Sequence, residues 1–337
     1  MKKQWFQNGK RIIRDGKRIL CDECPCCACG KFDKYPTIYV DKYATGTGDG
    51  SSWENAYTDI QTAINAHPKA EIQIKGYGES DPYVGTLYLG DCAFIKGVDD
   101  LYIAGGITGY INSVMSKNTK VENIKINGSH SIGRIVYVAN CELFQATITR
   151  CTYVNNCNLS GEEGSYYSNG EYKYDGTGGY INHCSYVTDC TVYYSQMIAA
   201  FYSNNYNTDC YAYMCKSGFL GWGSTHTGCT VEKSYYAGFR PVLYDPPMMS
   251  CYVLSANNYI SCISKNNVGG GFRGHGDTYI DCTAENNGSC GYRQIGRWCS
   301  YPDNYSEITP NVYIDCSDIN NCLESTSDCS NGKCMEV

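Results

Sequence analysis

The sequence predicts an all-β protein whose short strands wind as a parallel coil, and two observations support this. The first is a repeat in the second half of the chain. Its fullest copy, residues 279–293, contains Tyr-Ile-Asp-Cys, Asn-Asn and Gly-Tyr-Arg in that order. Residues 259–273 hold a second copy, and residues 313–321 hold a third that lacks the Gly-aromatic end. A period near 20 that places the same residue type in the same position indicates a solenoid.

The second observation is the alternation inside each copy, which has a period of 2. Ile280 and Cys282 lie two residues apart, so we expect them to face the interior while Asp281 faces out. The residues are strand formers, and no helical window of about a dozen residues follows residue 66. Turns stacked about 4.8 Å apart would place Cys over Cys inside the coil, Asn over Asn at a bend, and Gly-Phe over Gly-Tyr. Asn suits the bend because it tolerates left-handed backbone angles and its amide can bond to the next copy.

With these stacked positions the chain resembles the right-handed parallel β-helix superfamily, which contains pectate lyases, polygalacturonases, phage tailspikes and many bacterial surface proteins. The resemblance covers residues 84–325, or about eleven turns at this period. It implies the architecture, a coil of about 20 residues per turn, and leaves the function open.

The two ends of the chain differ from the coil. Asn8-Gly9 and Asp15-Gly16 are hairpin-turn signals between short strands, so residues 1–21 are expected to form a basic β-meander for attachment or assembly. Residues 22–37 follow as a Cys-rich linker, residues 38–83 as a cap, residues 84–325 as the coil, and residues 326–337 as a Cys-containing tail.

The cap should contain one short helix that covers the open end of the coil. Ser51 or Ser52 is the expected N-cap, and Pro68 should end the helix. The alternating residues 70–76 should begin the sheet. The helix would present one apolar face, made of Ala56, Ile60, Ala63 and Ile64.

Composition and charge limit the function classes. The chain has 337 residues, 33 Tyr against 8 Phe, and a net charge of −7. Residues 1–34 carry nine Lys/Arg and four Asp/Glu, which is +5, so the remainder carries −12. An acidic coil argues against nucleic acid as its partner. A Tyr-rich surface suits sugar stacking or subunit contact, although solvent-facing strand residues would account for it equally well.

The sequence also bears on location. The first residues contain no apolar core of a classical signal peptide, and the chain has no apolar run of 18 residues. We therefore expect no membrane span and a location on a virion or an extracellular cell surface. A virion component released by lysis fits this pattern, as does export by a route that the sequence does not reveal.

The chain has 23 Cys, and those in the coil are expected to be mostly free, buried thiols, with some bridging left open. The N-terminal group could bind zinc through Cys21, Cys24, Cys26 and Cys29, could form disulfides, or could have no covalent role. Because the ends of a solenoid lie far apart, disulfides between the two terminal groups would join chains head to tail into a fibre. The candidates are Cys21, Cys24, Cys26, Cys27, Cys29, Cys322, Cys329 and Cys334.

Two tripeptides resemble motifs of polygalacturonase-like hydrolases. They are Asn207-Thr208-Asp209 and Gly274-His275-Gly276, which make Asp209 and His275 the candidate catalytic residues. The paired Asp and the Arg-Ile-Lys motif of that family are missing. An inverting hydrolase needs two carboxylates across the bond, and Asp209 has only Asp189 as an evident neighbour. His275 between glycines also fits an exposed turn. A row of Asp residues could hold calcium, but it is broken at Gly228, so solvated carboxylates are the simpler interpretation.

A row of arginines is the other candidate site. Arg240, Arg273 and Arg293 each follow a Gly-aromatic pair, and Arg297 lies nearby. They could bind the carboxylates of an acidic glycan or pair with Asp281 and Glu285. Two irregular segments, residues 161–179 and 238–251, are the expected walls of any groove.

Together these observations predict a structural or adhesive protein of a phage particle or bacterial surface that presents a Tyr-rich, glycan-binding face. It would assemble with itself as a trimer or fibre, or with other particle proteins through residues 1–34. No resident cofactor is expected, with calcium and zinc the ions left open. The alternative is a polysaccharide lyase or glycoside hydrolase, which paired carboxylates in a groove beside the two irregular segments would favour.

Overall fold

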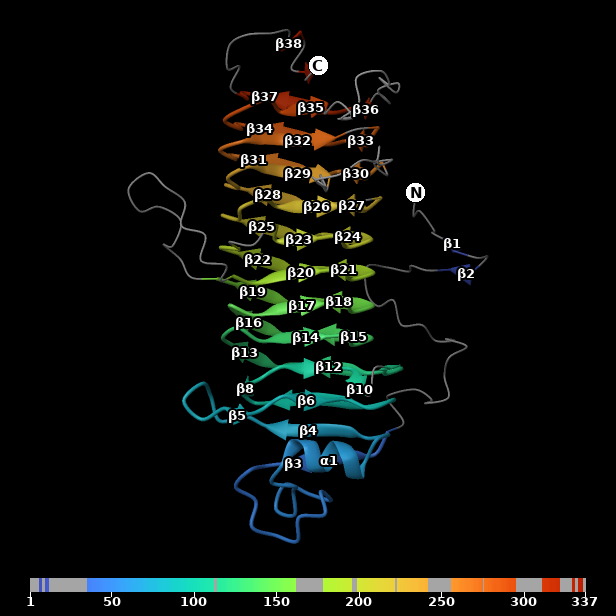
Figure 1. The fold of residues 1–337 in the computed structure, drawn as a ribbon, viewed down its shortest axis with the longest axis vertical. Helices are drawn as coiled ribbons and strands as arrows, with labels where there is room; N and C mark the ends of the chain where they lie inside the picture. The colour runs from blue at the N-terminus through green and yellow to red at the C-terminus, as the bar shows by residue number, and fades with distance from the viewer. Residues whose placement is uncertain are drawn as a thin grey trace, which may run out of the picture.

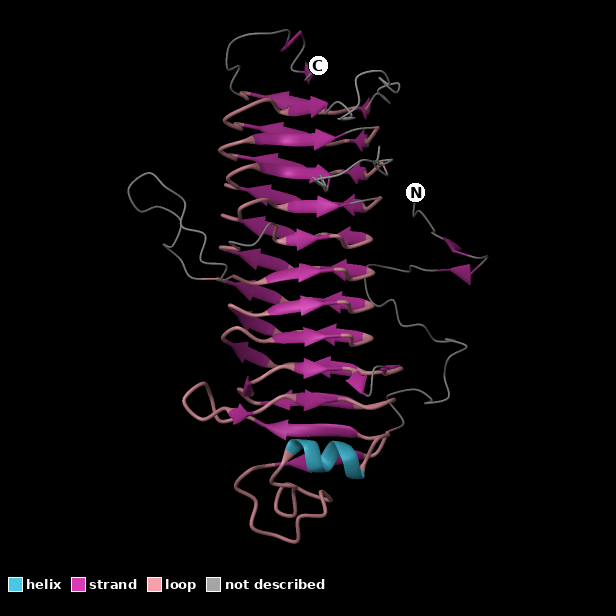
Figure 2. Cartoon of the chain, in the orientation of Figure 1, coloured by secondary structure: helices cyan, strands magenta, loops and turns pink. Residues whose placement is uncertain are grey.

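The computed structural model describes residues 6–7, 10–11, 35–111, 114–161, 178–195, 199–221, 223–241, 256–274, 276–294, 311–321, 329–330 and 333–335. These residues form one long coil with three flat faces, each face a β-sheet that runs the length of the molecule (Figure 1). The one α-helix among them lies across the N-terminal end of the coil (Figure 2).

We number the three sheets in the order in which the chain enters them. Sheet 1 contains, in order along the coil, β3 (Thr37–Val40), β4 (Glu71–Lys75), β7 (Phe94–Val98), β12 (Lys120–Glu122), β15 (Tyr137–Ala139), β18 (Tyr153–Asn155), β21 (Tyr186–Thr188), β24 (Tyr206–Thr208), β27 (Thr225–Thr227), β30 (Asn258–Ile260), β33 (Thr278–Ile280) and β36 (Val312–Ile314). Sheet 2 contains β5 (Tyr83–Val84), β8 (Tyr102–Ala104), β13 (Lys125–Asn127), β16 (Glu142–Phe144), β19 (Asn158–Ser160), β22 (Thr191–Tyr193), β25 (Tyr211–Tyr213), β28 (Thr230–Glu232), β31 (Ile263–Lys265), β34 (Thr283–Glu285) and β37 (Ser317–Ile319). Sheet 3 contains β6 (Leu87–Tyr88), β9 (Ile107–Thr108), β14 (Ser131–Gly133), β17 (Thr147–Thr149), β20 (Tyr180–Asn182), β23 (Phe201–Tyr202), β26 (Phe219–Gly221), β29 (Ala237–Pro241), β32 (Gly270–Gly274), β35 (Tyr292–Gln294), β39 (Lys333–Met335) and β38 (Cys329–Ser330).

Each turn of the coil contributes one strand to each sheet, and each strand pairs with its counterpart in the next turn. Tyr259, Tyr279 and Tyr313, for example, are register partners in sheet 1. The pairing is parallel in all three sheets except between β38 and β39. The chain is therefore a right-handed parallel β-helix, as the sequence predicts. Two antiparallel hairpins lie outside the sheets, β1 (Phe6–Gln7) with β2 (Lys10–Arg11) and β10 (Tyr110–Ile111) with β11 (Val114–Met115).

The first corner, between sheets 1 and 2, corrects the expected orientation of the repeat. Tyr279 and Cys282 are buried, whereas Ile280 is only half-buried on the outside. The cause is Asp281, which is a corner residue with a left-handed φ of 53° and not a strand residue. The turn at Asp281 resets the alternation, so that the residue before Ile280 and the residue after Asp281 both point inward.

The cysteines at the first corner occupy the expected interior position. Cys190 is a free buried thiol that donates to the Thr188 carbonyl at 3.2 Å, and burial raises its pKa. Cys92 and Cys290, which lie in distant turns of the coil, are not free thiols. Each of them takes part in its own disulfide. The free thiols stacked at the first corner, which we call the thiol row, are Cys141, Cys157, Cys190, Cys210, Cys229, Cys262, Cys282 and Cys316.

The second corner, between sheets 2 and 3, carries the predicted asparagine row, which consists of Asn267, Asn287 and Asn321. The residues before them have left-handed φ angles, 55° at Asn266 and 51° at Asn286. The amide of Asn267 donates to the Asn287 oxygen at 2.8 Å, and that of Asn287 donates to the Asn321 oxygen at 2.8 Å. The prediction that Asn stacks on Asn at a bend is confirmed.

The Gly-aromatic pairs also stack as predicted. Phe239, Phe272 and Tyr292 are register partners in sheet 3, and their rings lie parallel at 4.8 and 5.0 Å. Phe201 and Phe219 continue this column of buried rings toward the N-terminus at 4.5 Å. The core of the protein is thus a set of columns along the coil axis.

The N-terminal cap contains a shorter helix than expected, α1 (Ile60–Ala66). Its N-cap is Asp59, whose carboxylate accepts from the Thr62 backbone at 2.7 Å, and not Ser51 or Ser52. The predicted end before Pro68 is confirmed, and the expected apolar residues are buried. The sheet begins one strand earlier than predicted, because β3 pairs parallel to β4.

The terminal segments lie mostly outside the described residues. β1 and β2 pair antiparallel, with Gln7 opposite Lys10, while the rest of residues 1–34 and Cys322 are not described. Strand register places Cys329 opposite Cys334 within the same chain. The domain boundaries and the zinc and inter-chain disulfide roles of the terminal cysteines stay predictions. None of the described helices is long and apolar enough to cross a membrane.

Candidate functional site

A groove of about 470 Å³ lies on the outer face of sheet 2 in the N-terminal half of the coil, and we call it the sheet 2 groove. Its floor consists of side chains from β13, β16 and β19, which point outward because strand residues alternate between faces. It combines aromatic rings with amide, hydroxyl and charged groups. The lining residues that carry these groups are Glu79, Tyr102, Lys125, Asn127, Glu142, Phe144, Asn158, Ser160 and Tyr193.

Charged groups hold one another in place in this groove. The Lys125 ammonium lies 2.9 Å from the Asp100 carboxylate and 3.1 Å from that of Glu142, and these partners raise its pKa. The Asn127 amide donates to the carboxylate of Glu79. Both groove carboxylates are therefore engaged by a donor or a cation within the groove.

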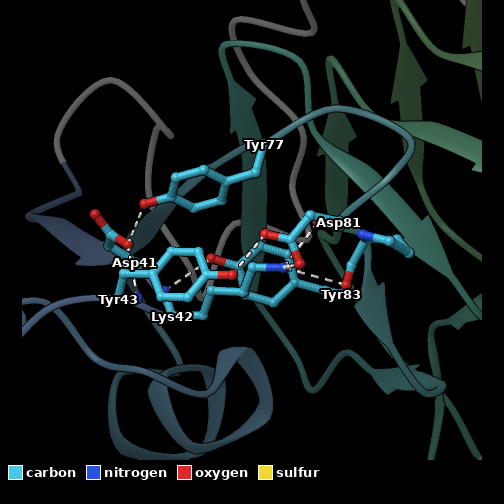
Figure 3. Close-up of polar contacts among 7 residues, drawn as sticks. Asp41, Lys42, Tyr43, Tyr77, Asp81 and Tyr83 are labelled. Atoms are coloured by element: carbon cyan, nitrogen blue, oxygen red, sulfur yellow. Dashed lines mark hydrogen bonds and ion pairs between the residues drawn. The ribbon is translucent and has the colours of Figure 1, made fainter.

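A polar cluster, which we call the clasp, positions the segment that carries Glu79 (Figure 3). The Lys42 ammonium donates to the Asp81 carboxylate at 2.5 Å and to the Asp81 carbonyl at 2.7 Å, and Tyr43 donates to the same carboxylate at 2.8 Å. Tyr83 accepts from the Lys42 backbone at 3.1 Å. The clasp thus joins residues 41–43 to residues 77–83, which include the loop beside β5 in Figure 1.

The titration shifts within the clasp agree with a structural role. Burial acts to raise the pKa of Asp41, but hydrogen bonds from Tyr77 and the Tyr43 backbone, together with Lys75, lower it overall. Burial raises the pKa of Tyr83 to about 12. Because the clasp donors and acceptors are used within the cluster, we assign it the task of fixing the wall of the sheet 2 groove.

A group of tyrosines continues the sheet 2 face beyond the groove. The ring of Tyr193, which also lines the groove, lies 6.2 Å from that of Tyr211 at 72° and 6.1 Å from that of Tyr213 at 65°. These tilted contacts leave parts of the ring faces uncovered. Tyr211 donates to Glu232 at 2.9 Å, and Glu232 pairs with Lys265 at 3.2 Å. We call Tyr193, Tyr194, Tyr211 and Tyr213 the tyrosine cluster.

A second groove, of about 540 Å³, lies on sheet 3, and we call it the sheet 3 groove. It is lined mostly by hydroxyl groups, two tyrosines, one amide and one imidazole. These side chains belong to Thr86, Tyr88, Thr108, Ser129, His130, Ser131, Gln145, Thr147 and Tyr180.

The two grooves flank the second corner of the coil. Ser160, in the sheet 2 groove, precedes residues 161–179, and Gly178, in the sheet 3 groove, lies at their end. Residues 162–177 of this irregular segment lie outside the described part of the chain, so its role as a groove wall stays a prediction. The other segment, residues 238–251, begins inside β29, and its residues 242–251 lie outside the described part of the chain.

The outer face of sheet 1 carries a different arrangement of tyrosines. Tyr137, Tyr153, Tyr186 and Tyr206 occupy successive turns, with parallel rings 4.7, 5.1 and 5.0 Å apart. Each inner ring is covered on both faces by its neighbours. This sheet 1 tyrosine stack therefore offers ring edges and hydroxyls to solvent, and it does not offer the open faces that sugar stacking requires.

Of the two predicted catalytic residues, the structure describes Asp209 but not His275. Asp209 is an exposed first-corner residue, and burial together with Asp189 raises its pKa. In the next turn Gly228 has a φ of 64°, and a Cβ there would lie 2.2 Å from the Asp209 carboxylate. No group of three metal-binding side chains occurs among the described residues. His275 lies outside them, so the pairing of Asp209 with His275 stays untested.

The predicted arginines lie on sheet 3. Arg240 and Arg273 follow the stacked Phe239 and Phe272, so they occupy neighbouring turns on the outer face. Asp281 and Glu285 lie at the first corner and on sheet 2, and neither forms an ion pair with a described residue. No described ion pair joins these acids to Arg240 or Arg273, and their pairing stays a prediction. The side chains of Arg293 and Arg297 are outside the description.

The residues of the sheet 2 groove were not singled out from the sequence, although a signal for them exists. Lys125, Glu142 and Asn158 are outward polar residues that each precede a buried Ile or Leu, at steps of 17 and 16 residues. A search confined to a period near 20 does not find these shorter turns.

Comparisons with known proteins place the fold in context. No protein-family model matches the chain, and no curated protein matches its sequence. Among solved structures it is similar to the A-module of the mannuronan C-5 epimerase AlgE4 from Azotobacter vinelandii, at 10% identity over 89% of this chain and 97% of that chain, with a TM-score of 0.33. It is also similar to ORF18 of Geobacillus virus E2, at 10% identity over 94% and 66% of the two chains, with a TM-score of 0.37. Pectate lyase Pel9A matches at 13% identity over 88% and 79%, with a TM-score of 0.30.

Proposed function

We propose that the protein is a structural, adhesive β-helix of a phage particle or bacterial surface, and that it binds glycans through the sheet 2 groove and the adjoining tyrosine cluster. The observation that carries this proposal is the combination of Phe144 and Tyr193 with Asn127, Asn158 and Ser160 on one rigid face. Apolar rings stack on the hydrophobic faces of sugars, and amide and hydroxyl groups bond to sugar hydroxyls. A site built on strands also holds these groups in fixed positions.

A polysaccharide lyase or hydrolase is the second candidate, and the two carboxylates of the groove favour it. Glu79 and Glu142 both line the sheet 2 groove. A hydrolase, however, needs one carboxyl group that is protonated when the bond breaks. Glu142 pairs with Lys125, and Glu79 accepts from Asn127, so both carboxylates already take part in contacts that hold the groove together. These contacts support binding more than hydrolysis.

The glycan-binding proposal predicts that removing a groove ring weakens binding. Tyr193→Ala should weaken affinity for the best ligand of a polysaccharide panel about tenfold, because a stacking contact of roughly 1.5 kcal/mol is lost. Affinity electrophoresis of the full chain is the measurement. Tyr206→Ala is the matched control, because Tyr206 is 43% exposed on sheet 1 and lies outside the groove.

Two results would contradict this assignment. One is equal loss in the Tyr193 and Tyr206 variants, and the other is retention of every polysaccharide by the Tyr193 variant. Release of reducing ends or of unsaturated sugars, abolished in Glu142→Gln, would favour the enzyme instead. Self-assembly as a trimer or a fibre stays a separate prediction, which light scattering tests.

A further inference from the structure

The outer face of sheet 3 differs from the other two faces in its charges. From residue 128 onward, the described segments that form this sheet and its two bordering corners are 128–136, 145–152, 178–185, 199–205, 215–221, 223–224, 234–240, 256–257, 267–274, 276–277 and 287–294. Their one acidic residue, Asp277, is buried in the interior at the third corner, so none of the described outward-facing side chains is acidic. The described basic side chains of these segments are His130, Arg134, Arg150, His183, Lys216, Arg240 and Arg273. A protein with a net charge of −7 thus has one face whose described outward-facing residues are only neutral or basic.

The acidic residues of the described coil gather on the opposite side. Asp189, Asp209, Asp281 and Asp315 are left-handed residues of the first corner, between sheets 1 and 2. Glu142, Glu232 and Glu285 lie on sheet 2. Charge is therefore separated around the coil axis.

The basic residues form two rows that run along the axis. In the first row Arg134, Arg150 and His183 occupy the third corner, after sheet 3, in consecutive turns, with φ angles of 57°, 54° and 52°. Backbone bonds fix their order, since Arg134 donates to Thr149 and Arg150 donates to Asn182. Arg150 and His183 are exposed. The second row is Arg240 over Arg273, on the strands themselves.

Arg240 lacks the counter-charge that a half-buried guanidinium normally has. No acidic residue among those described forms an ion pair with it, and its Nε has no hydrogen-bond partner there. Burial, followed by repulsion from Arg273, lowers its pKa. Its one described ring contact is with Tyr236, at 5.7 Å. Because a desolvated cation is costly unless paired, an incoming anion would gain from this position.

The sheet 3 groove lies on the same face and supplies a complementary chemistry. Its side chains include five hydroxyl-bearing Ser and Thr residues, with Tyr88 and Tyr180 at hand. Tyr88 is 50% exposed. Such groups bond to sugar hydroxyls and stack on sugar rings.

We propose that the sheet 3 face binds a linear glycan that carries carboxylate or sulfate groups and lies along the coil axis. Six steps separate β14 from β32 in sheet 3, which at about 4.8 Å per step gives a path of about 30 Å. The neutral parts of the chain contact the sheet 3 groove, and its anionic groups contact the two rows of basic side chains. This second surface is independent of the sheet 2 groove.

A glycan fits this face better than a nucleic acid does. Nucleic acids carry dense charge on a wide surface, and their affinity comes mainly from phosphate contacts. Such a polymer would meet the carboxylates of the neighbouring faces and the overall negative charge of the molecule. A single glycan chain is narrow enough to stay on the basic face.

The test compares charge removal on this face with equal charge removal elsewhere. The probes are polygalacturonate, dextran sulfate, neutral dextran and single-stranded DNA, each titrated onto the full chain by calorimetry at about 50 and 200 mM salt. Arg150→Gln with Arg240→Gln removes two charges from sheet 3. The matched control, Lys120→Gln with Lys265→Gln, removes two charges from sheets 1 and 2.

We expect polygalacturonate or dextran sulfate to bind, to weaken with salt, and to lose at least about tenfold in affinity in the arginine variant only. If that variant does not fold, Arg150→Gln alone, at an exposed position, should lose about threefold. Neutral dextran binding as strongly as the acidic glycans, equal losses in both double variants, or binding of DNA alone would overturn the proposal. Tyr206→Ala, which lies outside both grooves, should leave acidic-glycan binding unchanged. A loss in the arginine variant but not in Tyr193→Ala supports the sheet 3 face, and a loss in Tyr193→Ala alone supports only the sheet 2 groove, so failure here and failure of the sheet 2 assignment are distinguishable.

Discussion

The two halves of the coil share one backbone geometry but fill their interiors differently. In the N-terminal half, the interior position of sheet 1 holds Val121, Val138, Val154 and Val187, and that of sheet 3 holds Ile132, Ile148 and Ile181. In the C-terminal half, the interior position of sheet 1 holds polar or aromatic residues, which are Asn207, His226, Tyr259 and Tyr279. The interior position of sheet 3 holds aromatic rings, which are Phe201, Phe219, Phe239, Phe272 and Tyr292.

Sheet 2 compensates for the added volume of the rings. Its interior position holds Leu143 and Leu159 in the N-terminal half but Ala212, Val231, Ser264 and Ala284 farther along. Protein interiors are close-packed, so larger residues on two faces require smaller ones on the third. The comparison teaches that the coil conserves total volume per turn and not residue type at each position.

The halves also differ in how polar groups are satisfied. At the third corner the interior residues are Cys151 and Cys184 in the N-terminal half, followed by Asn204, Ser224, Asn257, Asp277 and Asn311. The amides bond from one turn to the next, as in the 2.8 Å bond from the Asn257 backbone to Asp277. Each C-terminal turn therefore depends on the side chains of its neighbours, whereas each N-terminal turn depends mainly on apolar contact.

The largest expected loss of stability tests how much the column of stacked rings in sheet 3 contributes to folding. Phe239→Ala should lower the free energy of unfolding by about 5 kcal/mol, at the upper end for a buried Phe. Phe239 contacts parallel rings at 5.0 and 4.8 Å and the tilted ring of Tyr259 at 5.5 Å, and all these contacts would be lost. Ile148→Ala, at the same position of sheet 3 in the other half, should cost about 3 kcal/mol. Urea denaturation followed by circular dichroism measures both values.

Equal losses in these two variants would contradict the comparison. They would show that a column of rings stabilises the coil no more than a column of aliphatic side chains does.

A second effect, of about 4 kcal/mol, concerns a single buried acid in the C-terminal half. Burial raises the pKa of Asp277 to about 7, although hydrogen bonds from Asn257 and Tyr279 act in the opposite direction. Between pH 3.8, the ordinary pKa of an Asp, and about pH 7 the folded state holds a proton that the unfolded state has released, so stability falls as pH rises through this window. Asp277→Asn removes this loss. The variant should exceed the parent by about 4 kcal/mol at pH 8 and match it near pH 4.

The control for this pH dependence is His226, also in the C-terminal half. Burial lowers its pKa from 6.5 to about 4. The unfolded state therefore binds a proton before the folded state does, and stability falls as pH drops below 6.5. The Asp277 variant should keep this acid limb while losing the fall above pH 4. An unfolding free energy that differs by the same amount at pH 4 and pH 8 would exclude titration of Asp277 as the cause.

The sequence predicts the coil because its repeat records side-chain stacking directly. Cys262 over Cys282 and Asn267 over Asn287 are one-turn contacts, so their spacing reveals the turn length. The prediction that Ile280 faces the interior was wrong for a physical reason. The left-handed turn at Asp281 breaks the period of 2, and Asp is not a residue that a pattern search treats as a turn inside a strand.

The candidate site was harder to predict than the fold. Arg240 and Arg273 could be found because they share a motif, but their position on one face depends on how the strands of sheet 3 pair. The sheet 2 groove depends on the clasp, which joins Lys42 to Asp81 across 39 residues. No local pattern records such a contact. The interior acid Asp277 was missed because it follows a Gly-His-Gly that drew attention to catalysis instead.

The smallest expected change in the free energy of unfolding distinguishes polar groups with a hydrogen-bond partner from polar groups without one at the second corner. Asn287→Ala should cost about 3 kcal/mol, because it leaves the buried Asn267 backbone N–H without the acceptor it now reaches at 3.1 Å. Ser234 occupies the same corner position two turns earlier, and its buried hydroxyl has no partner among the described residues. Ser234→Ala should therefore be neutral or stabilising by up to about 1 kcal/mol. Both are read from chemical denaturation midpoints. A destabilisation in Ser234→Ala as large as that in Asn287→Ala would mean that side-chain volume, and not bonding between turns, holds the C-terminal half together.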